Sequence, residues 1–205
     1  MKVNYQKESE KIISSLTERK SLILHSCCGP CSSYVLEYLS QYFDITVAFY
    51  NPNIEPYEEY EHRLSEQRRL IREAFPEIKL VEIPYDNLEF CQAVEGLESL
   101  GEGSERCFKC FEFRMKKVAE FAGVKYDYFT TTLSVSPYKN CEKINELGFE
   151  IQNDGTPRYF PADFKKKNGY KRSIELSKEY NLYRQNYCGC RYSLAESLKI
   201  QSNKK

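Results

Sequence analysis

The sequence predicts an α/β protein built on a doubly wound, mostly parallel, Rossmann-like sheet with a helical C-terminal part. Two observations favour this fold class. Short apolar runs of strand length alternate with longer helical patterns, and no internal repeat or low-complexity tract interrupts them. Strands and helices that alternate at this spacing form right-handed crossovers, which place the strands parallel to one another.

The predicted sheet begins with residues 21–26, an apolar run that ends in polar residues. Pro30 opens a helix because proline fits the first helical turn, and apolar side chains follow at helical spacing over residues 34–39. A second strand is predicted over residues 44–50, and the sequence Asn51-Pro52-Asn53 stops it.

The same alternation continues along the chain. A charged helix is predicted over residues 55–74 and a third strand over 78–84. Two helices follow over 88–100 and 107–121, then a fourth strand over 126–133 and a further helix over 139–147. The helix predicted over residues 55–74 carries an apolar inner stripe, namely Tyr57, Tyr60, Leu64, Leu70 and Ile71. This order favours a single sheet that is wound in both directions.

We expect one domain, residues 1–205, that comprises an N-terminal extension (1–20), the α/β sheet core (21–150) and a basic helical segment (151–205). The net charge of zero hides an uneven distribution, because residues 51–105 carry a net charge of −9 and residues 155–205 one of +8. A basic segment on a neutral protein favours a polyanionic partner. Ordinary solvated helix surface is the alternative.

The start of the sequence has no apolar stretch long enough for a signal peptide. No segment approaches the roughly 20 apolar residues that a membrane span needs. Because charged residues also make up 29% of the chain, we expect a cytoplasmic protein with no membrane partner. Disulfide frameworks are rare in that compartment, so clustered cysteines there are more often metal ligands or catalytic groups.

Seven of the nine cysteines fall into three clusters, Cys27-Cys28-Gly29-Pro30-Cys31, Cys107-Phe108-Lys109-Cys110 and Cys188-Gly189-Cys190. The first cluster directly follows the first predicted strand, and open α/β sheets bind ligands beyond the carboxyl ends of their strands. The following helix N-terminus lowers thiol pKa values and favours the thiolates that iron and zinc bind. The pattern predicts one shared inorganic site together with a redox-active dithiol, and a zinc staple is the alternative.

The second cluster fits a metal site. Cys107 and Cys110 lie three residues apart at the start of a predicted helix, so both thiols can face one point. Arg106 and Arg114 bracket this pair and would offset the charge of its thiolates. A zinc half-site that caps the helix is the alternative.

The third cluster suits an electron relay. Cys188 and Cys190 are separated by one glycine, so they can close a small strained disulfide, and strain makes a disulfide labile. The alternative is a metal chelate that completes the other two clusters. Cys31 is interpreted as a buried thiol on the helix, with a ligand to a further iron as the alternative.

These motifs resemble, in order along the chain, those of the cobalamin-independent epoxyqueuosine reductases of the QueH type. The matching segments span most of the chain and cover residues 22–32, 106–114, 129–139, 163–170 and 183–193. The resemblance implies a nucleotide-alpha-hydrolase-like sheet. It also implies a [4Fe-4S] cluster on Cys27, Cys28, Cys107 and Cys110, and a redox-active disulfide between Cys188 and Cys190.

The resemblance further implies a substrate, the epoxide of epoxyqueuosine at the wobble position of a tRNA anticodon, and queuosine as the product. Removing the epoxide oxygen as water requires two electrons, which an external donor must supply, and two protons. Thiolates can hold an iron–sulfur cluster of tunable potential, and an iron with an exchangeable position can act as a Lewis acid towards the departing oxygen.

Further side chains are candidates for the reaction. Asp163 is a candidate proton donor or metal ligand, and a partner for the neighbouring lysines is the alternative. His25 is a candidate partner for a cluster sulfur or a substrate oxygen, and a satisfied core histidine is the alternative. Thr131, Thr132 and Ser134 follow the fourth strand, where side chains reach the ligand-binding edge of the sheet.

The basic segment carries the predicted tRNA contacts. Positive side chains that can bind phosphates lie on both sides of Tyr170, whose ring can stack on an unpaired base. These side chains are Lys165, Lys166, Lys167, Lys171 and Arg172. Two other functions compete with the reductase. An ATP-dependent tRNA thiolase would need a Ser-Gly-Gly-x-Asp-Ser phosphate loop, which residues 25–30 do not provide, and a zinc-stabilised RNA-binding module would leave the third cysteine cluster without a role.

Overall fold

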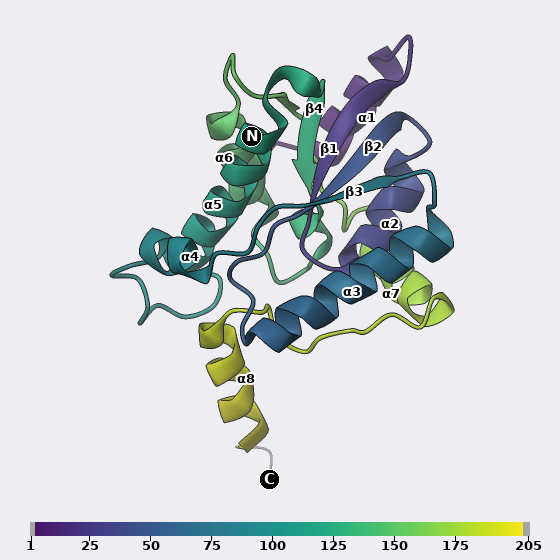
Figure 1. Cartoon of the computed structure of the whole chain (residues 1–205). Coiled ribbons are helices and arrows are strands. Elements are labelled where there is room, and N and C mark those ends of the chain that lie inside the picture. Colours follow the sequence, from purple (N-terminus) through teal and green to yellow (C-terminus); the bar gives the residue numbers. More distant parts are fainter. Residues whose placement is uncertain (1–2, 203–205) are drawn as a thin grey trace.

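A five-stranded sheet forms the centre of the computed structural model, which describes residues 3–202. The strands are β1 (Lys20–Ser26), β2 (Phe43–Phe49), β3 (Lys79–Glu82), β4 (Tyr128–Thr131) and β5 (Arg158–Tyr159). Their order across the sheet is β3-β2-β1-β4-β5, and every pair is parallel. The predicted doubly wound parallel sheet is confirmed (Figure 1).

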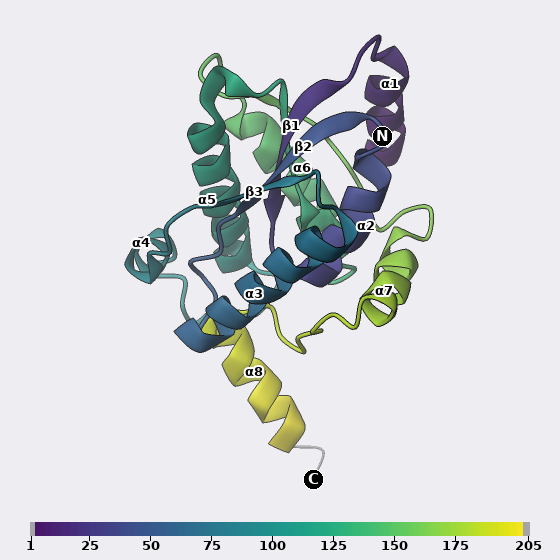
Figure 2. The same cartoon turned by 45° about the vertical axis from the view of Figure 1, so that its right-hand side comes forward.

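Helices cover both faces of this sheet (Figures 1 and 2). One face carries α1 (Tyr5–Ser15), α2 (Gly29–Leu39), α3 (Tyr57–Ala74) and α7 (Gly169–Glu179). The other face carries α5 (Glu105–Ala122) and α6 (Cys141–Ile151), with α4 (Asn87–Ala93) packed against α5. The last helix, α8 (Arg191–Ser202), extends away from the rest of the molecule. No helix in residues 3–202 combines the length and the apolar character that crossing a bilayer requires.

The side chains of β1 alternate between the two cores. Leu22 and Leu24 pack with α2, whereas Ile23 packs with Met115 and Val118 of α5, and all five are almost completely buried. Burying one such side chain contributes roughly 1.5–3 kcal/mol. A strand that is apolar on both faces therefore belongs in the middle of a sheet that is covered on both sides.

Some element boundaries differ from the prediction for local reasons. The helix predicted over 88–100 ends at Ala93, and Gly96 then takes a φ of +79° that favours glycine. The strand predicted over 126–133 ends at Thr131, whose side chain accepts a hydrogen bond from the Leu133 amide at 3.2 Å and caps a short 3-10 helix, η2 (Thr132–Val135). The sequence analysis anticipated neither α1 nor β5.

The winding direction reverses at β1. From β1 the chain proceeds outwards to β2 and β3, and it then returns to place β4 on the other side of β1. The carboxyl ends of β1 and β4 therefore form the switch point where such sheets bind ligands. The Cys27 amide donates a hydrogen bond to Thr132 Oγ1 at 3.1 Å across this point.

Candidate active site

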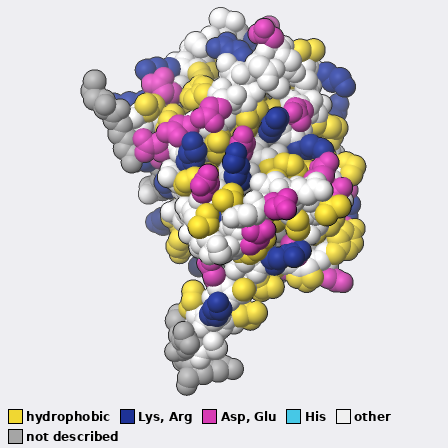
Figure 3. Space-filling view, turned by 90° about the vertical axis from the view of Figure 1, so that its left-hand side faces the viewer, with side chains coloured by type: hydrophobic (Ala, Val, Ile, Leu, Met, Phe, Trp, Pro, Cys, Tyr) yellow, Lys and Arg dark blue, Asp and Glu magenta, His cyan; other side chains and the backbone are white. Residues whose placement is uncertain are grey.

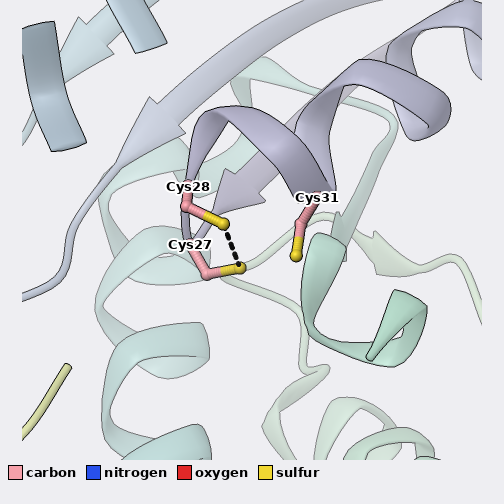
Figure 4. Close-up of side chains that lie close together, drawn as sticks. All are labelled: Cys27, Cys28 and Cys31. Atoms are coloured by element: carbon pink, nitrogen blue, oxygen red, sulfur yellow. Dashed lines mark hydrogen bonds between the residues drawn. The ribbon is translucent and has the colours of Figure 1, made fainter. Parts of the chain in front are cut away.

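Three thiols converge where β1 leads into α2. The Sγ atoms of Cys27, Cys28 and Cys31 lie within 4.8 Å of one another, and those of Cys27 and Cys28 are 3.7 Å apart (Figure 4). Cys28 is the N-cap residue of α2 and Cys31 lies in its first turn, so the helix brings the two together. Over residues 3–202, this is the one group of ligand atoms close enough to share a metal ion. The position of Cys31 favours the metal-ligand alternative over an isolated buried thiol.

Hydrogen bonds couple the three thiols to one another. Hydrogen bonds with Cys27 and then Cys31 hold the pKa of the Cys28 thiol well below its ordinary value, and the Gln185 side chain lowers it further. The same contacts with Cys27 and Cys28 raise the pKa of Cys31 well above its ordinary value. These hydrogen bonds therefore favour the thiolate at Cys28, and the thiolate is the form that binds a metal.

The other two cysteine clusters meet around a smaller cavity. Cys107, Cys110, Cys188 and Cys190 all line it. Burial raises the pKa of Cys110 to about 12 and also raises the pKa of Cys107. Buried thiols of this kind bind a metal only by releasing their protons to solvent.

A larger cavity of about 620 Å³ lies beside the first group of thiols. Cys27, Cys28 and Cys31 line its wall, and Cys188 lines both this cavity and the smaller one. The fold thus gathers the three cysteine clusters at the carboxyl edge of the sheet. Their arrangement fits a thiolate-bound metal centre beside a space for a substrate.

Arg114 places a positive charge among these thiols. It lines the large cavity although it is only 2% exposed. Its Nη1 donates to Asn51 Oδ1 at 3.0 Å and its Nε to the Cys110 carbonyl at 3.3 Å, while Nη2 has no partner in the described part of the chain. Arg106, by contrast, donates to two backbone carbonyls of the preceding loop and lies 4.3 Å from the Tyr192 ring. Of the two arginines that bracket the second cluster, Arg114 is the one that lines the large cavity, and compensation of thiolate charge stays a prediction.

The loop of the third cluster is anchored to the start of α3. Arg63 Nη1 donates to the Cys188 carbonyl at 3.0 Å, and the Glu55 amide donates to the Gly189 carbonyl at 2.8 Å. All nine cysteines are free thiols in this structure. The disulfide between Cys188 and Cys190 therefore stays a prediction.

His25 is a satisfied core residue. It is 1% exposed, and its ring nitrogens lie 2.8 Å from Thr131 Oγ1 and 3.2 Å from the Tyr50 carbonyl oxygen. Burial lowers its pKa to about 3, so the ring is neutral at physiological pH. Thr132 does reach the thiols, because its hydroxyl donates to Cys27 Sγ at 3.3 Å.

Asp163 lies outside the large cavity. Asp163 is not among the described residues that line the cavity. Its Oδ1 lies 3.3 Å from Lys165 Nζ. Next to it, burial raises the pKa of Cys141 to about 12, and the charge of Asp163 adds to this effect. The contact with Lys165 is the ion pair that the sequence analysis left open, and a catalytic role for Asp163 stays a prediction.

Carboxylates neutralise most of the basic run. The ion pairs are Lys165–Asp163, Lys167–Glu10, Lys171–Glu175 and Arg172–Glu37. Of the positive side chains predicted to contact tRNA, including Lys166, none lines the large cavity, although Tyr170 from the same run does. Their contact with tRNA stays a prediction.

The sequence analysis did not single out several residues of the cavity wall. They include Tyr138, Lys139, Arg184 and Gln185, which come from two loops without a periodic pattern. Burial opposes the charge of Lys139, but the thiols of Cys188, Cys27 and Cys31 raise its pKa above the ordinary value. The sequence offered one indication of these four residues, because all of them lie within the motif segments 129–139 and 183–193.

The comparisons with known proteins agree with this geometry. The family model described as epoxyqueuosine reductase QueH matches residues 22–196. This chain belongs to the QueH family. The predicted family is thereby confirmed, and a reductase is supported over the thiolase and the zinc-stabilised RNA-binding module.

Curated relatives carry the same description over most of their length. QueH of Staphylococcus epidermidis is 44% identical over 199 residues, which cover 92% of this chain and 84% of the relative. QueH of Streptococcus pyogenes is 42% identical, and the match covers 94% of this chain and 78% of the relative. QueH of Thermotoga maritima is 34% identical, and the match covers 86% of this chain and 91% of the relative.

A solved structure shares the fold of this QueH chain. It is the U34-tRNA thiolase NcsA from Methanococcus maripaludis with its [4Fe-4S] cluster, which matches with a TM-score of 0.53 and 14% identity and covers 97% of this chain and 70% of NcsA. The match shows that the two chains share their overall fold.

Proposed function

We propose that this QueH chain is a cytoplasmic enzyme that reduces epoxyqueuosine to queuosine at the wobble position of a tRNA anticodon and releases the epoxide oxygen as water. The observation that carries the proposal is that Cys27, Cys28, Cys31 and Cys188 line a cavity of about 620 Å³ at the switch point of the sheet, while Cys107, Cys110 and Cys190 line a smaller cavity that shares Cys188 with it. Ligand pockets typically measure roughly 300–1,000 Å³. The cavity is therefore large enough for a single nucleoside.

The side chains around this cavity fit an iron–sulfur centre. Cys27 and Cys28 line it at the end of β1, whereas Cys107 and Cys110, at the start of α5, line the smaller cavity that shares Cys188 with it. We assign these four thiols to the [4Fe-4S] cluster and Cys31 to an additional iron. When bound, the iron centre would transfer electrons and polarise the epoxide oxygen.

The chain itself compensates the charge of such a centre. The unpartnered Nη2 of Arg114 is available as a hydrogen-bond donor at the cavity wall. Lys139 adds a second cation, which the neighbouring thiols keep protonated. The buried charge of Arg114 and the partly buried charge of Lys139 favour the thiolate forms of the cysteines and would stabilise the oxygen as it acquires negative charge.

We assign the relay of electrons to Cys188 and Cys190. Oxidation of this dithiol to a disulfide releases two electrons and two protons, which are the numbers that conversion of an epoxide to an alkene and water consumes. An external electron donor then reduces the disulfide again. Asp163 remains a proposed proton donor, and the basic run from Lys165 to Arg172 a proposed contact for the body of the tRNA.

The proposal is tested with protein that is purified and reconstituted without oxygen. We expect a brown protein with iron and sulfide in equal amounts, and we expect it to convert epoxyqueuosine to queuosine in tRNA when a reductant is present. Mass spectrometry of the digested nucleosides measures the product. A colourless protein that binds zinc, takes up no iron and leaves epoxyqueuosine unchanged would refute the proposal.

Cysteine variants separate the assigned roles. We expect Cys107→Ala to lose the cluster, and Cys188→Ala to keep its iron but to lose repeated turnover. Cys91→Ser is the matched control, because Cys91 lies on α4 outside the three clusters and should keep both iron and activity. A Cys107→Ala protein with a full cluster, together with a Cys188→Ala protein without one, would reverse the two assignments.

A further inference from the structure

The rim of the large cavity carries an aromatic side chain that the fold does not use. Tyr138 lines the cavity and is 80% exposed. Its ring has no aromatic or cation–π partner in the described part of the chain. Its backbone is nevertheless held in a turn, because the Tyr138 amide donates to Ser136 Oγ at 3.3 Å. An exposed ring on a restrained backbone beside a cavity offers a flat surface to a ligand.

The other aromatic side chains of the cavity wall are already engaged. The Tyr187 hydroxyl donates to the Glu55 carbonyl at 2.8 Å, and the Arg63 guanidinium lies 5.0 Å from the centre of the Tyr187 ring. Tyr170 packs against the core between the sheet and α2. Tyr138 is therefore the cavity tyrosine whose ring faces are free.

A positive charge without an acidic partner lies on the same rim. Arg184 is exposed and lines the cavity, and it forms no ion pair with any carboxylate in residues 3–202. Its Nη1 donates to Ser177 Oγ at 3.1 Å, which restrains the side chain. The basic run from Lys165 to Arg172 differs, because carboxylates pair with most of its positive charges.

The face over α4 and α5 is less suited to a polyanion. Figure 3 shows basic and acidic side chains interspersed there. Lys117 pairs with Glu89 and Lys109 with Glu112, each at 3.0 Å. A phosphate backbone on this face would meet negative charges together with positive ones.

We propose that Tyr138 stacks on an unpaired base that flanks the nucleotide in the cavity, and that Arg184 binds a phosphate of the same single strand. The inference rests on the proposed function and extends it to the neighbouring nucleotides of the anticodon loop. An enzyme that takes one nucleoside out of an RNA loop leaves its neighbours unstacked. An aromatic platform accepts any base, because every base has a π-face.

The first test measures the binding of an anticodon stem-loop RNA to the reconstituted holoenzyme without an electron donor, by fluorescence anisotropy. Tyr138→Ala should weaken binding roughly 10- to 100-fold, which is the usual effect of removing one stacking ring. Tyr138→Phe keeps the ring and should bind within about twofold of the parent protein. Phe121→Ala is the matched control, since Phe121 is 49% exposed on α5 and does not line the cavity.

Two results of this test would overturn the stacking role. One is unchanged binding by Tyr138→Ala, and the other is an equal loss for the Ala and Phe variants, which would indicate a contact through the hydroxyl. Misfolding does not confuse the comparison, because a side chain that is 80% exposed contributes little to the core.

An abasic RNA identifies the partner of Tyr138. Two stem-loops are made, each without the base on one side of the wobble nucleotide. We expect one of them to bind the parent protein weakly and to lose nothing more with Tyr138→Ala, since the stacked pair is then already broken. Additive losses with both RNAs would refute stacking on a flanking base.

Salt dependence tests the contact of Arg184 with a phosphate. Arg184→Gln should reduce the slope of log Kd against log salt by about 0.7, the value for one phosphate contact with a single strand. Lys125→Gln is the control, because Lys125 is exposed near the start of β4, at the opposite edge of the sheet. An unchanged slope for Arg184→Gln would overturn the phosphate contact.

The outcomes also separate this inference from the proposed function. Binding that depends on Tyr138, by an enzyme that never reduces epoxyqueuosine, would refute the proposed function and support the stacking site. Reduction with equal kcat/KM in the parent protein and in Tyr138→Ala would support the proposed function and refute the stacking site.

Discussion

The buried, neutral His25 makes the stability of this protein depend on pH in a predictable way. Burial lowers its pKa from 6.5 to about 3 in the folded state. Because the folded protein holds the neutral ring and the unfolded chain binds a proton, the contribution of His25 is fully present above pH 6.5 and is lost as the pH falls from 6.5 towards 3. Between pH 7 and pH 5 the loss is about 2 kcal/mol, from 1.36 kcal/mol for each pKa unit.

The assay is urea unfolding of the parent protein and of His25→Gln, each at pH 7 and at pH 5 and with the same metal loading. Glutamine has no titrating group in this range, so the variant should lose about 2 kcal/mol less between the two pH values. The carboxylates, the cysteines and the exposed His62 are common to both proteins, and their effects cancel. An equal loss of stability in the two proteins would refute the conclusion that His25 is held neutral.

Three further predictions follow from close contacts and buried charge. Gly148→Ala should lower the melting temperature, because its Cβ would lie 2.2 Å from the Tyr159 ring, and overpacking of roughly 1–3 kcal/mol outweighs the better helix propensity; an unchanged or higher value would contradict this. Gly189→Ala should slow turnover at unchanged iron content, because Gly189 has a φ of +131° and the new Cβ would lie 3.0 Å from Arg63 Nη1. Full turnover of this variant would show that the loop tolerates the strain. Arg114→Met should release iron to a chelator faster than Arg114→Lys does, because lysine keeps the positive charge. Equal rates of iron release for both variants and the parent protein would exclude a role of Arg114 in compensating thiolate charge.

The local pattern of the sequence was sufficient for the fold class and for the main location of the chemistry. The apolar run of β1 is buried on both faces, so it has to lie inside a covered parallel sheet. A helix that begins directly after that strand, at Gly29 and Pro30, places Cys27 and Cys28 at the carboxyl edge. These relations depend on residues that are close together in the sequence, which is why they were predictable.

Other features depended on contacts between distant segments. The sequence left two roles open for His25, and packing against Thr131 and Tyr50 decided for the core. In the same way, the neutralisation of Lys167 and Arg172 required acidic partners from α1 and α2, Glu10 and Glu37, which no local pattern indicates.

The sequence by itself therefore determined the parallel sheet, the three cysteine clusters and the resemblance to the QueH family, because periodicity and motif spacing are local properties of the chain. Only the tertiary structure decided that Cys31 joins Cys27 and Cys28, that Arg114 lines the cavity with an Nη2 that has no hydrogen-bond partner among residues 3–202, and that the rim of the cavity presents Tyr138. These features arise where loops from separate crossovers meet at the switch point. The distances between such loops are set by the packing of the whole sheet and its helices.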